Sequence, residues 1–444
     1  MSQEIENIKY CPGHSYSDKR QRGRCASCNK DHFIQEFKTW SSGNTDIDKI
    51  IQESQINNFH KLQWIPYDNF QNIEHIADGS QGSVYSTKLE KGIKWNWNFI
   101  KRNWEYNLIG YKVAFKEINS RYDIAELLKV LKTVDGYFFA KYYGISKNPS
   151  TQNYIIVMDL FDDNLHDLLT KTFWELRWQS KLDILSSIVD GLGILHEKNF
   201  VHCDLHSRNI LNKNIYSTVL DLGLCKLEND IILNSNTKNN KIYGLIPYIP
   251  PEVLRGNEFT KKGDIYSFGG IMYEIVTAQR PFVDQAHDTY LMIDICNGVR
   301  PKIPDFMLNW IPEWYLDLMY RCWNDDPSER PTADELFNLF YVISGKLSDD
   351  IVDDDVMQQL QIADENQQNT SKSQNKELFD LFSHSSKIHP QSCYIGRHIH
   401  TLHGLRDLLE EIKSGKSSDP NLLIKSNESR SILAINRNSK QVEK

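Results

Sequence analysis

Three polar residues with a fixed spacing lie among short apolar, strand-like runs of the chain. Asp204 is followed five positions later by Asn209, and Asp221 opens the tripeptide Asp221-Leu222-Gly223. Transfer of a phosphoryl group from ATP needs Mg²⁺ held over the phosphates and a carboxylate that orients the attacking hydroxyl. These side chains can supply both. A lone Asp-x-Gly is usually an ordinary turn, so it is the combination that predicts a phosphoryl-transfer centre.

Two further stretches have the composition of phosphate-binding elements. Val113-Ala114-Phe115-Lys116 ends an apolar run in a lysine, which is costly to bury unless anionic groups surround it. The run from Ile76 to Val84 contains Gly79 and Gly82, and small residues let a backbone loop close over phosphates. Either motif alone is weak. Their order along the chain favours one nucleotide-binding region.

In that order, the motifs resemble those of eukaryotic protein kinases. The catalytic-loop match is His202-Cys203-Asp204 with Asn209, and Asp221-Leu222-Gly223 matches the element that follows it. Later landmarks are Asp264 to Gly269 and Cys322 to Pro331. The last of these is similar to the ending of tyrosine-kinase-like and tyrosine kinases. With its Cys/His head, its HCDLHSRN loop and its HPQSCYIGR tail, the whole layout resembles an expanded fungal family of tyrosine-kinase-like kinases.

The resemblance implies a role for each matched residue. Asp204 would accept or orient the hydroxyl proton of the substrate, Asn209 and Asp221 would hold Mg²⁺, and Lys116 would position the ATP phosphates. Lys116 would also pair with Glu126, in a helix-like segment. The other nucleotide contacts that the resemblance implies are Ile76, Ala77 (at the first glycine of the motif), Gly79, Gly82, Val84, Ala114, Met158, Asp159, Phe161 and Leu211.

Two buried charges in the large lobe should pair according to the same resemblance. Glu252 follows Pro250, which replaces the alanine of the kinase A-P-E motif, and Arg330 lies in the Cys322 to Pro331 run. Buried charges need partners, so each residue supports the assignment of the other. Asp264 would tie down the backbone of the catalytic loop.

Several positions depart from the common kinase pattern. Cys203 stands where most kinases have an arginine that binds a phosphate on the activation loop. His206 and Leu245 replace the lysine and threonine of serine/threonine kinases, whereas Tyr248 is the residue type of that class. We therefore favour serine/threonine specificity, with tyrosine as the alternative.

The replacement at Cys203 also bears on regulation. We expect kinase activity that is largely independent of phosphorylation of the activation loop, because a thiol cannot bind a phosphate as an arginine does. Control would then pass to the amino-terminal segment, the tail or a partner. The loop hydroxyls in question belong to Ser235, Thr237 and Tyr243.

The amino-terminal segment contains two pairs of residues with metal-ligand spacing. Cys11 and His14 form one pair, and Cys25 and Cys28 form the other. Two such pairs can close a tetrahedral zinc site, and the polar residues between them have little to bury, so metal would supply the folding free energy. The sequence predicts structural Zn²⁺ here. The alternative is a disordered tail with incidental cysteines.

The expected fold is an α+β, bilobal kinase domain with a β-rich amino-terminal lobe and a mainly α carboxy-terminal lobe. Before it, Phe33, Phe37 and Trp40 recur at helical spacing, and Asn44 or Thr45 could cap a second helix. The predicted parts are a zinc-binding module (1–32), a helical linker (33–69), the kinase domain (70–345, with lobes of about 70–160 and 161–345) and a largely disordered tail (346–444).

Two segments lie outside the common kinase plan. The Trp-rich link between Val84 and Ala114 predicts an extended hairpin that packs on the lobe. In the polar tail, His400 to Ile412 could form one short amphipathic helix that docks a protein partner. The zinc module is a second candidate for such a partner.

Composition limits the functional classes. The 444 residues carry a net charge of −8, which gives no general attraction to nucleic acid or anionic membranes. The first residues lack the apolar stretch of a signal peptide, and the eight cysteines suggest thiols and metal ligands. We expect a cytoplasmic or nuclear signalling kinase that acts on a protein substrate with ATP and Mg²⁺. The alternatives are a pseudokinase scaffold and a zinc-module adaptor.

Overall fold

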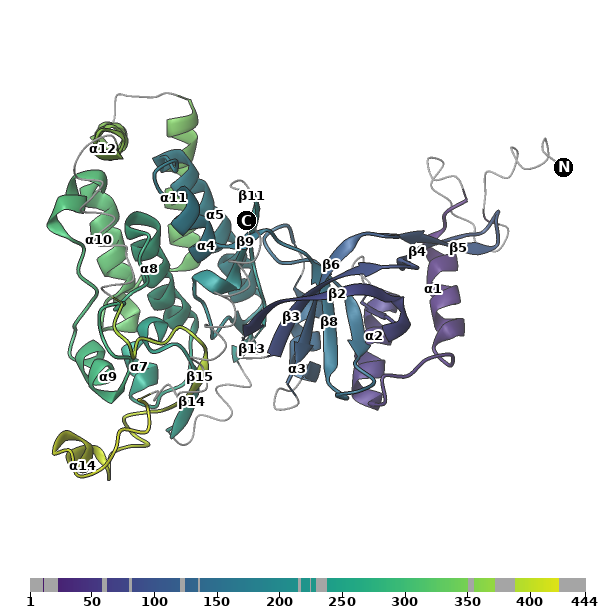
Figure 1. Cartoon of the computed structure of the whole chain (residues 1–444). Coiled ribbons are helices and arrows are strands. Elements are labelled where there is room, and N and C mark those ends of the chain that lie inside the picture. The colour runs from purple at the N-terminus through teal and green to yellow at the C-terminus, as the bar shows by residue number, and fades with distance from the viewer. Residues whose placement is uncertain are drawn as a thin grey trace, which may run out of the picture. The chain divides into compact units, whose positions relative to one another are not determined.

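In the computed structural model, the chain forms two compact units (Figure 1). Unit 1 comprises residues 1–168, 183–202 and 208–227, and unit 2 comprises residues 169–182, 203–207 and 228–444. The structure describes residues 11, 23–57, 62–79, 82–119, 124–134, 136–214, 217–223, 225–228, 238–349, 355–371 and 388–422.

A six-stranded sheet forms the centre of unit 1. Its strand order is β1-β7-β8-β6-β3-β2, with only β1 and β7 parallel among neighbouring strands. Alternating apolar residues bury one face, where Leu89, Phe115 and Val157 lie in one hydrophobic cluster. The strands are β1 (Gln63–Trp64), β2 (Phe70–Gly79), β3 (Gly82–Leu89), β6 (Lys112–Ile118), β7 (Tyr142–Lys147) and β8 (Tyr154–Asp159).

Two helices that pack against one another accompany this sheet, α2 (Thr45–Asn57) and α3 (Ile124–Thr133). The predicted cap of the second linker helix is confirmed, because the Asn44 side chain accepts hydrogen bonds from two backbone amides in the first turn of α2. Three isoleucines at helical spacing in α2 are buried, namely Ile47, Ile50 and Ile51.

The Trp-rich link forms the predicted hairpin, β4 (Ile93–Asn98) paired antiparallel with β5 (Asn103–Asn107). Helix α1 (Ala26–Glu36) packs on it. The Trp97 ring stacks on His32 with centroids 3.5 Å apart, and the Trp104 indole donates to the Glu36 carboxylate at 2.7 Å. The hairpin therefore provides the surface on which α1 packs.

Shorter elements of unit 1 follow the sheet along the chain. Strand β11 lies between β12 and β9, and β10 pairs with β13. Helix α5 precedes the catalytic loop in the chain; its first residues belong to unit 2 and the rest to unit 1. These elements are β9 (Asp163–Asn164), α4 (Leu165–Thr172), α5 (Trp178–Glu197), β10 (Phe200–Val201), β11 (Ile210–Asn214), β12 (Ser217–Leu220) and β13 (Lys226–Leu227).

Unit 2 is mainly helical, and its central helix is α8 (Lys261–Thr277), which is buried along almost all of its length. The Arg330 guanidinium donates two hydrogen bonds to the Glu252 carboxylate, at 2.7 and 2.8 Å, so the predicted pair is confirmed. The helices around α8 are α7 (Pro251–Leu254), α9 (Thr289–Cys296), α10 (Glu313–Cys322) and α11 (Ala333–Ser348). Among the described residues, no helix is both long and apolar enough to cross a bilayer.

The prediction of a largely disordered tail is wrong for residues 355–371 and 388–422. Helix α12 (Asp355–Ser371) buries Met357, Leu360 and Ala363 at helical spacing, and the Trp310 indole donates to Thr370. These few apolar residues are diluted by polar neighbours, so composition alone gave no signal of the helix. Further on, the structure describes strand β15 (Arg397–His400) and helix α14 (Leu409–Lys413).

The short helix expected from His400 to Ile412 is shorter than predicted and begins later in the chain. His400 ends a strand, and the helix begins only at Leu409.

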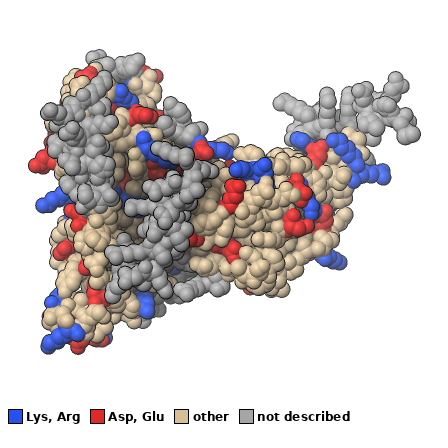
Figure 2. Space-filling model, viewed as in Figure 1, with Lys and Arg blue, Asp and Glu red and all other residues tan. Residues whose placement is uncertain are grey.

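On the face drawn in Figure 2, acidic and basic side chains are interspersed among the described residues. This agrees with the similar numbers of the two kinds in the sequence, 59 Asp and Glu against 51 Lys and Arg.

Candidate functional site

The most distinctive pair of side chains in unit 1 is Lys116 with Asp221. Lys116 lies on β6 and Asp221 directly follows β12, and the Lys116 Nζ is 3.1 Å from the Asp221 Oδ2. Only 14% and 13% of the two side chains are exposed. Opposite charges that are largely removed from water need each other, and the strand ends bring them together. Sequence analysis singled out both residues.

Tyr142 completes this centre, and sequence reasoning missed it. Its hydroxyl donates to the Asp221 Oδ1 at 2.8 Å and accepts from the backbone amide of Leu222 at 3.0 Å. No motif includes Tyr142. The one available signal is its strand register, because Tyr142 pairs with Met158 across β7 and β8, and Met158 pairs with Ala114 on β6.

The protonation states of the centre follow from these contacts. Burial by itself would raise the pKa of the Asp221 carboxyl, but the Lys116 ammonium and the Tyr142 hydrogen bond outweigh it and hold that pKa below its usual range. Burial and the neighbouring carboxylate raise the pKa of Tyr142, so its hydroxyl keeps its proton. Asp221 is therefore an anion with one lysine and one hydroxyl donor directed at it.

Asn209 lies beside this carboxylate. The backbone amide of Asp221 donates to the Asn209 carbonyl at 2.9 Å, across the start of the β11–β12 hairpin. The two predicted Mg²⁺ ligands are thus neighbours in unit 1. A carboxylate and an amide oxygen are ligands that Mg²⁺ accepts.

Several predicted adenine contacts share one hydrophobic cluster of unit 1. Its buried members are Ala114, Ala140, Met158 and Val219. Strand pairing places it near the charged centre, because Val84 on β3 lies opposite Lys116 on β6. The partly buried residues packed against the cluster are Val84, Tyr142, Leu160, Phe161 and Leu211.

The glycine-rich segment forms the β2–β3 hairpin. Ala77 pairs with Val84, and Gly79 pairs with Gly82 at its end. A Cβ on Gly82 would lie 1.7 Å from the Glu117 carbonyl oxygen, at a φ of +152°, so only glycine fits there. Ile76 is about half exposed on β2. The tip residues 80 and 81 lie outside the described residues.

Two of the predicted nucleotide residues have other partners. The expected Lys116–Glu126 pair is not formed. The Glu126 carboxylate instead pairs with Lys129, whose Nζ lies 2.5 Å from the Glu126 Oε1, and 47% of the Glu126 side chain is exposed. Leu127 and Leu128 define the buried face of α3, which directs Glu126 elsewhere. The Asp159 carboxylate accepts a hydrogen bond from the Tyr143 hydroxyl.

The predicted catalytic residue, Asp204, lines a pocket of unit 2. Its buried carboxylate oxygen Oδ1 is 3.6 Å from the Nε2 of His206. Cys203 has a positive φ of 64°, and its amide donates to the Asp264 carboxylate at 3.1 Å, which confirms the anchoring role expected of Asp264. The pocket is lined by Cys203, Asp204, Leu205, His206, Gly244, Leu245, Tyr248, Ile249, Phe259 and Ser267.

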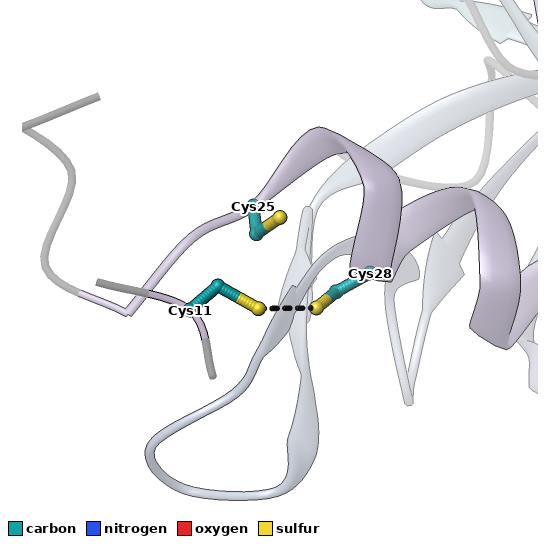
Figure 3. Close-up of side chains that lie close together, drawn as sticks. All are labelled: Cys11, Cys25 and Cys28. Atoms are coloured by element: carbon teal, nitrogen blue, oxygen red, sulfur yellow. Dashed lines mark hydrogen bonds between the residues drawn. The ribbon is translucent and has the colours of Figure 1, made fainter. Parts of the chain in front are cut away.

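Three of the four predicted zinc ligands converge at the start of α1 (Figure 3). The sulfur atoms of Cys11, Cys25 and Cys28 lie within 4.8 Å of one another, and those of Cys11 and Cys28 are 3.2 Å apart. Zn–S bonds of about 2.3 Å in a tetrahedron place sulfurs roughly 3.8 Å apart, so this cluster fits the metal. Burial and the adjacent thiols raise the pKa of Cys28. His14 lies outside the described residues.

We predict that Tyr142→Phe lowers the free energy of unfolding of unit 1 by about 1–3 kcal/mol, because the buried Asp221 carboxylate and Leu222 amide each lose a partner. Native-state hydrogen exchange of the β6 and β8 amides measures this quantity. Tyr137→Phe is the matched control, because Tyr137 is 97% exposed and its change should stay within about 0.5 kcal/mol. Equal values for the two variants would contradict the assignment.

Comparison with known proteins agrees with this geometry. The model of the family described as protein tyrosine and serine/threonine kinase matches residues 70–340. The chain is 28% identical over 323 residues to the probable serine/threonine-protein kinase roco5 of Dictyostelium discoideum, covering 67% of this chain and 10% of that protein.

Two further relatives come from other groups of organisms. A putative serine/threonine-protein kinase/receptor, R826, of Acanthamoeba polyphaga mimivirus is 30% identical, over 61% of this chain and 15% of that protein. Receptor-interacting serine/threonine-protein kinase 4 of Mus musculus is 26% identical, over 60% of this chain and 33% of that protein. The chain thus spans a third or less of each of these relatives. Because the family match covers more than half of its length and includes both Lys116 and Asp221, the chain belongs to the protein tyrosine and serine/threonine kinase family.

Proposed function

We propose that this chain is a Mg²⁺-dependent serine/threonine-protein kinase that transfers the γ-phosphate of ATP to protein hydroxyls. The observation that carries the proposal is the buried Lys116–Asp221 pair beside the apolar cluster of Ala114 and Met158. A lysine and a carboxylate at the edge of an apolar cluster suit a ligand with one flat apolar end and one anionic end, as ATP has. The relatives named above support the serine/threonine class.

In the proposed mechanism, adenine packs against Val84, Ala114 and Met158, and the phosphates take the place of Asp221 as the partner of Lys116. Asp221 and Asn209 would then hold Mg²⁺, which would neutralise the charge that develops on the phosphates. The hydroxyl of Tyr142 keeps the Asp221 carboxylate oriented during this exchange. Residues 70–345 form the kinase domain in this proposal.

Asp204 is the proposed base that orients the acceptor hydroxyl. The Asp264 carboxylate anchors the backbone of the Asp204 loop by accepting a hydrogen bond from the Cys203 amide. Across the pocket, the Ser267 hydroxyl donates to the Tyr248 carbonyl and holds the segment at Tyr248. A Ser or Thr side chain of the substrate would enter the pocket that Asp204 shares with Leu245 and Tyr248. We further propose a role in intracellular signalling, with the zinc module or the tail as the place where a protein partner binds.

One observation favours the alternative of a scaffold without turnover. The Lys116–Glu126 pair that active kinases need is not formed. However, Lys116, Asp204 and Asp221 are all present, and a repositioning of α3 on nucleotide binding would complete the centre. We therefore favour an enzyme whose described state is a resting one.

We also propose one structural Zn²⁺ per chain, bound by Cys11, His14, Cys25 and Cys28. The three sulfur atoms lie close enough together to bind one cation. Binding would release the thiol protons to solvent and leave thiolate ligands on the metal. Because α1 packs on the β4–β5 hairpin, this metal would link Cys11 to α1 and through it to the hairpin. An adaptor role for this module is compatible with catalysis elsewhere in the chain.

We predict that Asp204→Asn lowers kcat for a generic protein substrate with Mg-ATP by about 10²–10⁴-fold, the usual contribution of a positioned base. Asp221→Asn should remove detectable transfer, because a neutral amide binds Mg²⁺ poorly. Asp407→Asn is the control, because that carboxylate is 88% exposed, and it should act like the parent. Phosphoamino-acid analysis should show phosphoserine and phosphothreonine. Transfer at the parental rate in Asp221→Asn would disprove the assignment.

Elemental analysis tests the zinc proposal. The purified chain should contain about one zinc per molecule, and the double variant Cys25→Ser, Cys28→Ser should contain almost none. Cys296→Ser, which changes a cysteine of unit 2 outside the cluster, should keep the metal. Unchanged zinc content in the double variant would rule this site out.

A further inference from the structure

Within unit 2, a strand from the tail pairs with a strand of the activation segment, which is the stretch of the chain from Gly223 to Glu252. Strand β15 lies antiparallel to β14 (Lys241–Gly244), with Lys241 opposite His400 and Gly244 opposite Arg397 (Figure 1). Ile399, at the centre of the ladder, is completely buried. More than 150 positions therefore separate the two partners in sequence, yet they form one sheet.

The same tail segment supports a wall of the Asp204 pocket. Leu245 and Tyr248 follow β14 directly, line that pocket, and form one hydrophobic cluster with Tyr394. The Tyr394 hydroxyl donates to the Pro281 carbonyl at 2.7 Å, and the Arg280 guanidinium lies 4.2 Å from the centre of its ring. Tyr394 is thus fixed at both its face and its tip.

Polar contacts fasten the rest of the segment to the lobe. The Thr401 amide donates to the Asn240 carbonyl at 3.0 Å, and the Leu402 amide donates to the Leu254 carbonyl at 2.9 Å. Farther along, the Asp419 carboxylate accepts from both the amide and the hydroxyl of Thr289, at the start of α9. The segment is therefore bound to the activation segment, to α7 and to α9.

We propose that residues 388–422 are an in-cis binding partner of the activation segment, which hold Lys241 to Tyr248 in place as one wall of the acceptor pocket. This inference rests on the proposed kinase function. Its chemical basis is backbone pairing at the edge of β14 together with the buried side chains of Ile399 and Tyr394. Neither contact requires phosphate.

Cys203 leaves the activation segment without the arginine that would bind a loop phosphate, so the segment has to be ordered by other contacts. Cys203 is buried and carries a thiol, which cannot bind a loop phosphate as an arginine would. Tyr243 packs its ring edge-on to His398 at 5.4 Å, and its hydroxyl oxygen is buried. A phosphate could be added to Tyr243 only after the surroundings of this hydroxyl had opened.

The test compares two isoleucines of the same segment in the full-length chain. Ile399→Ala removes a buried side chain of β15, whereas Ile395→Ala removes one that is 55% exposed. For Ile399→Ala we expect amide exchange in β14 to accelerate at least about tenfold, because a buried cavity weakens the ladder. We expect KM for a protein substrate to rise and KM for ATP to stay unchanged. Ile395→Ala should match the parent in all three quantities.

Different results would count against the role of the tail and against the proposed kinase function. Unchanged β14 exchange in Ile399→Ala, or a gain in turnover as for an inhibitory tail, would overturn the in-cis role. Absence of transfer in the parent would count against the kinase proposal, yet the exchange measurement would still decide whether the tail holds β14. If Ile399→Ala does not fold, Tyr394→Phe keeps the ring and loses only the bond to Pro281. It should shift exchange and KM in the same directions by less, and parental values would overturn the proposal.

Discussion

The structure of unit 1 depends on one constraint, which is that a lysine and an aspartate are held together away from water. Separating Lys116 from Asp221 would leave two poorly solvated charges, so the surrounding elements must keep them in contact. Strand β6 fixes the lysine, and the β11–β12 hairpin fixes the aspartate. Tyr142 then occupies the second carboxylate oxygen. A ligand that brings its own anion and cation can replace these partners without exposing either charge.

Unit 2 meets a different requirement, which is to give the Asp204 pocket, the proposed acceptor site, a defined wall. Its polar anchors are Asp264 on the catalytic-loop backbone and the Glu252–Arg330 pair beside α7. The tail adds the strand and the tyrosine that lie behind Leu245 and Tyr248. In this account the order of the segment comes from the covalent chain, whereas a phosphorylated loop would obtain it from a modification.

The features that could be predicted from sequence are those in which local chemistry decides the structure. Asn44 caps α2 because its side chain accepts from amides next to it, and the Trp-rich link pairs with itself because its alternation is local. Motif spacing also identified Lys116, Asn209 and Asp221, since strand ends and a tight hairpin place them. The Glu252–Arg330 pair followed from the resemblance to kinases, and the need to neutralise buried charge supports it.

The features that were missed depend on distant or diluted signals. Glu126 has the motif spacing, but the leucine stripe of α3 decides which side of the helix is buried and leaves that carboxylate outside. Tyr142 belongs to no motif and acts only through strand register. The tail is polar overall, so the burial of a few residues such as Leu360 and Ile399 depends on surfaces that form elsewhere in the chain.

Titration calorimetry of ATP with and without Mg²⁺ tests the central claim most directly, because it measures whether the Lys116–Asp221 pair opens to admit nucleotide and metal. We expect Mg²⁺ to strengthen ATP binding by at least about tenfold, or roughly 1.4 kcal/mol. Asp221→Asn should abolish that gain while retaining weak ATP binding through Lys116. Equal affinity with Mg²⁺ and with a chelator in the parent protein would contradict the account.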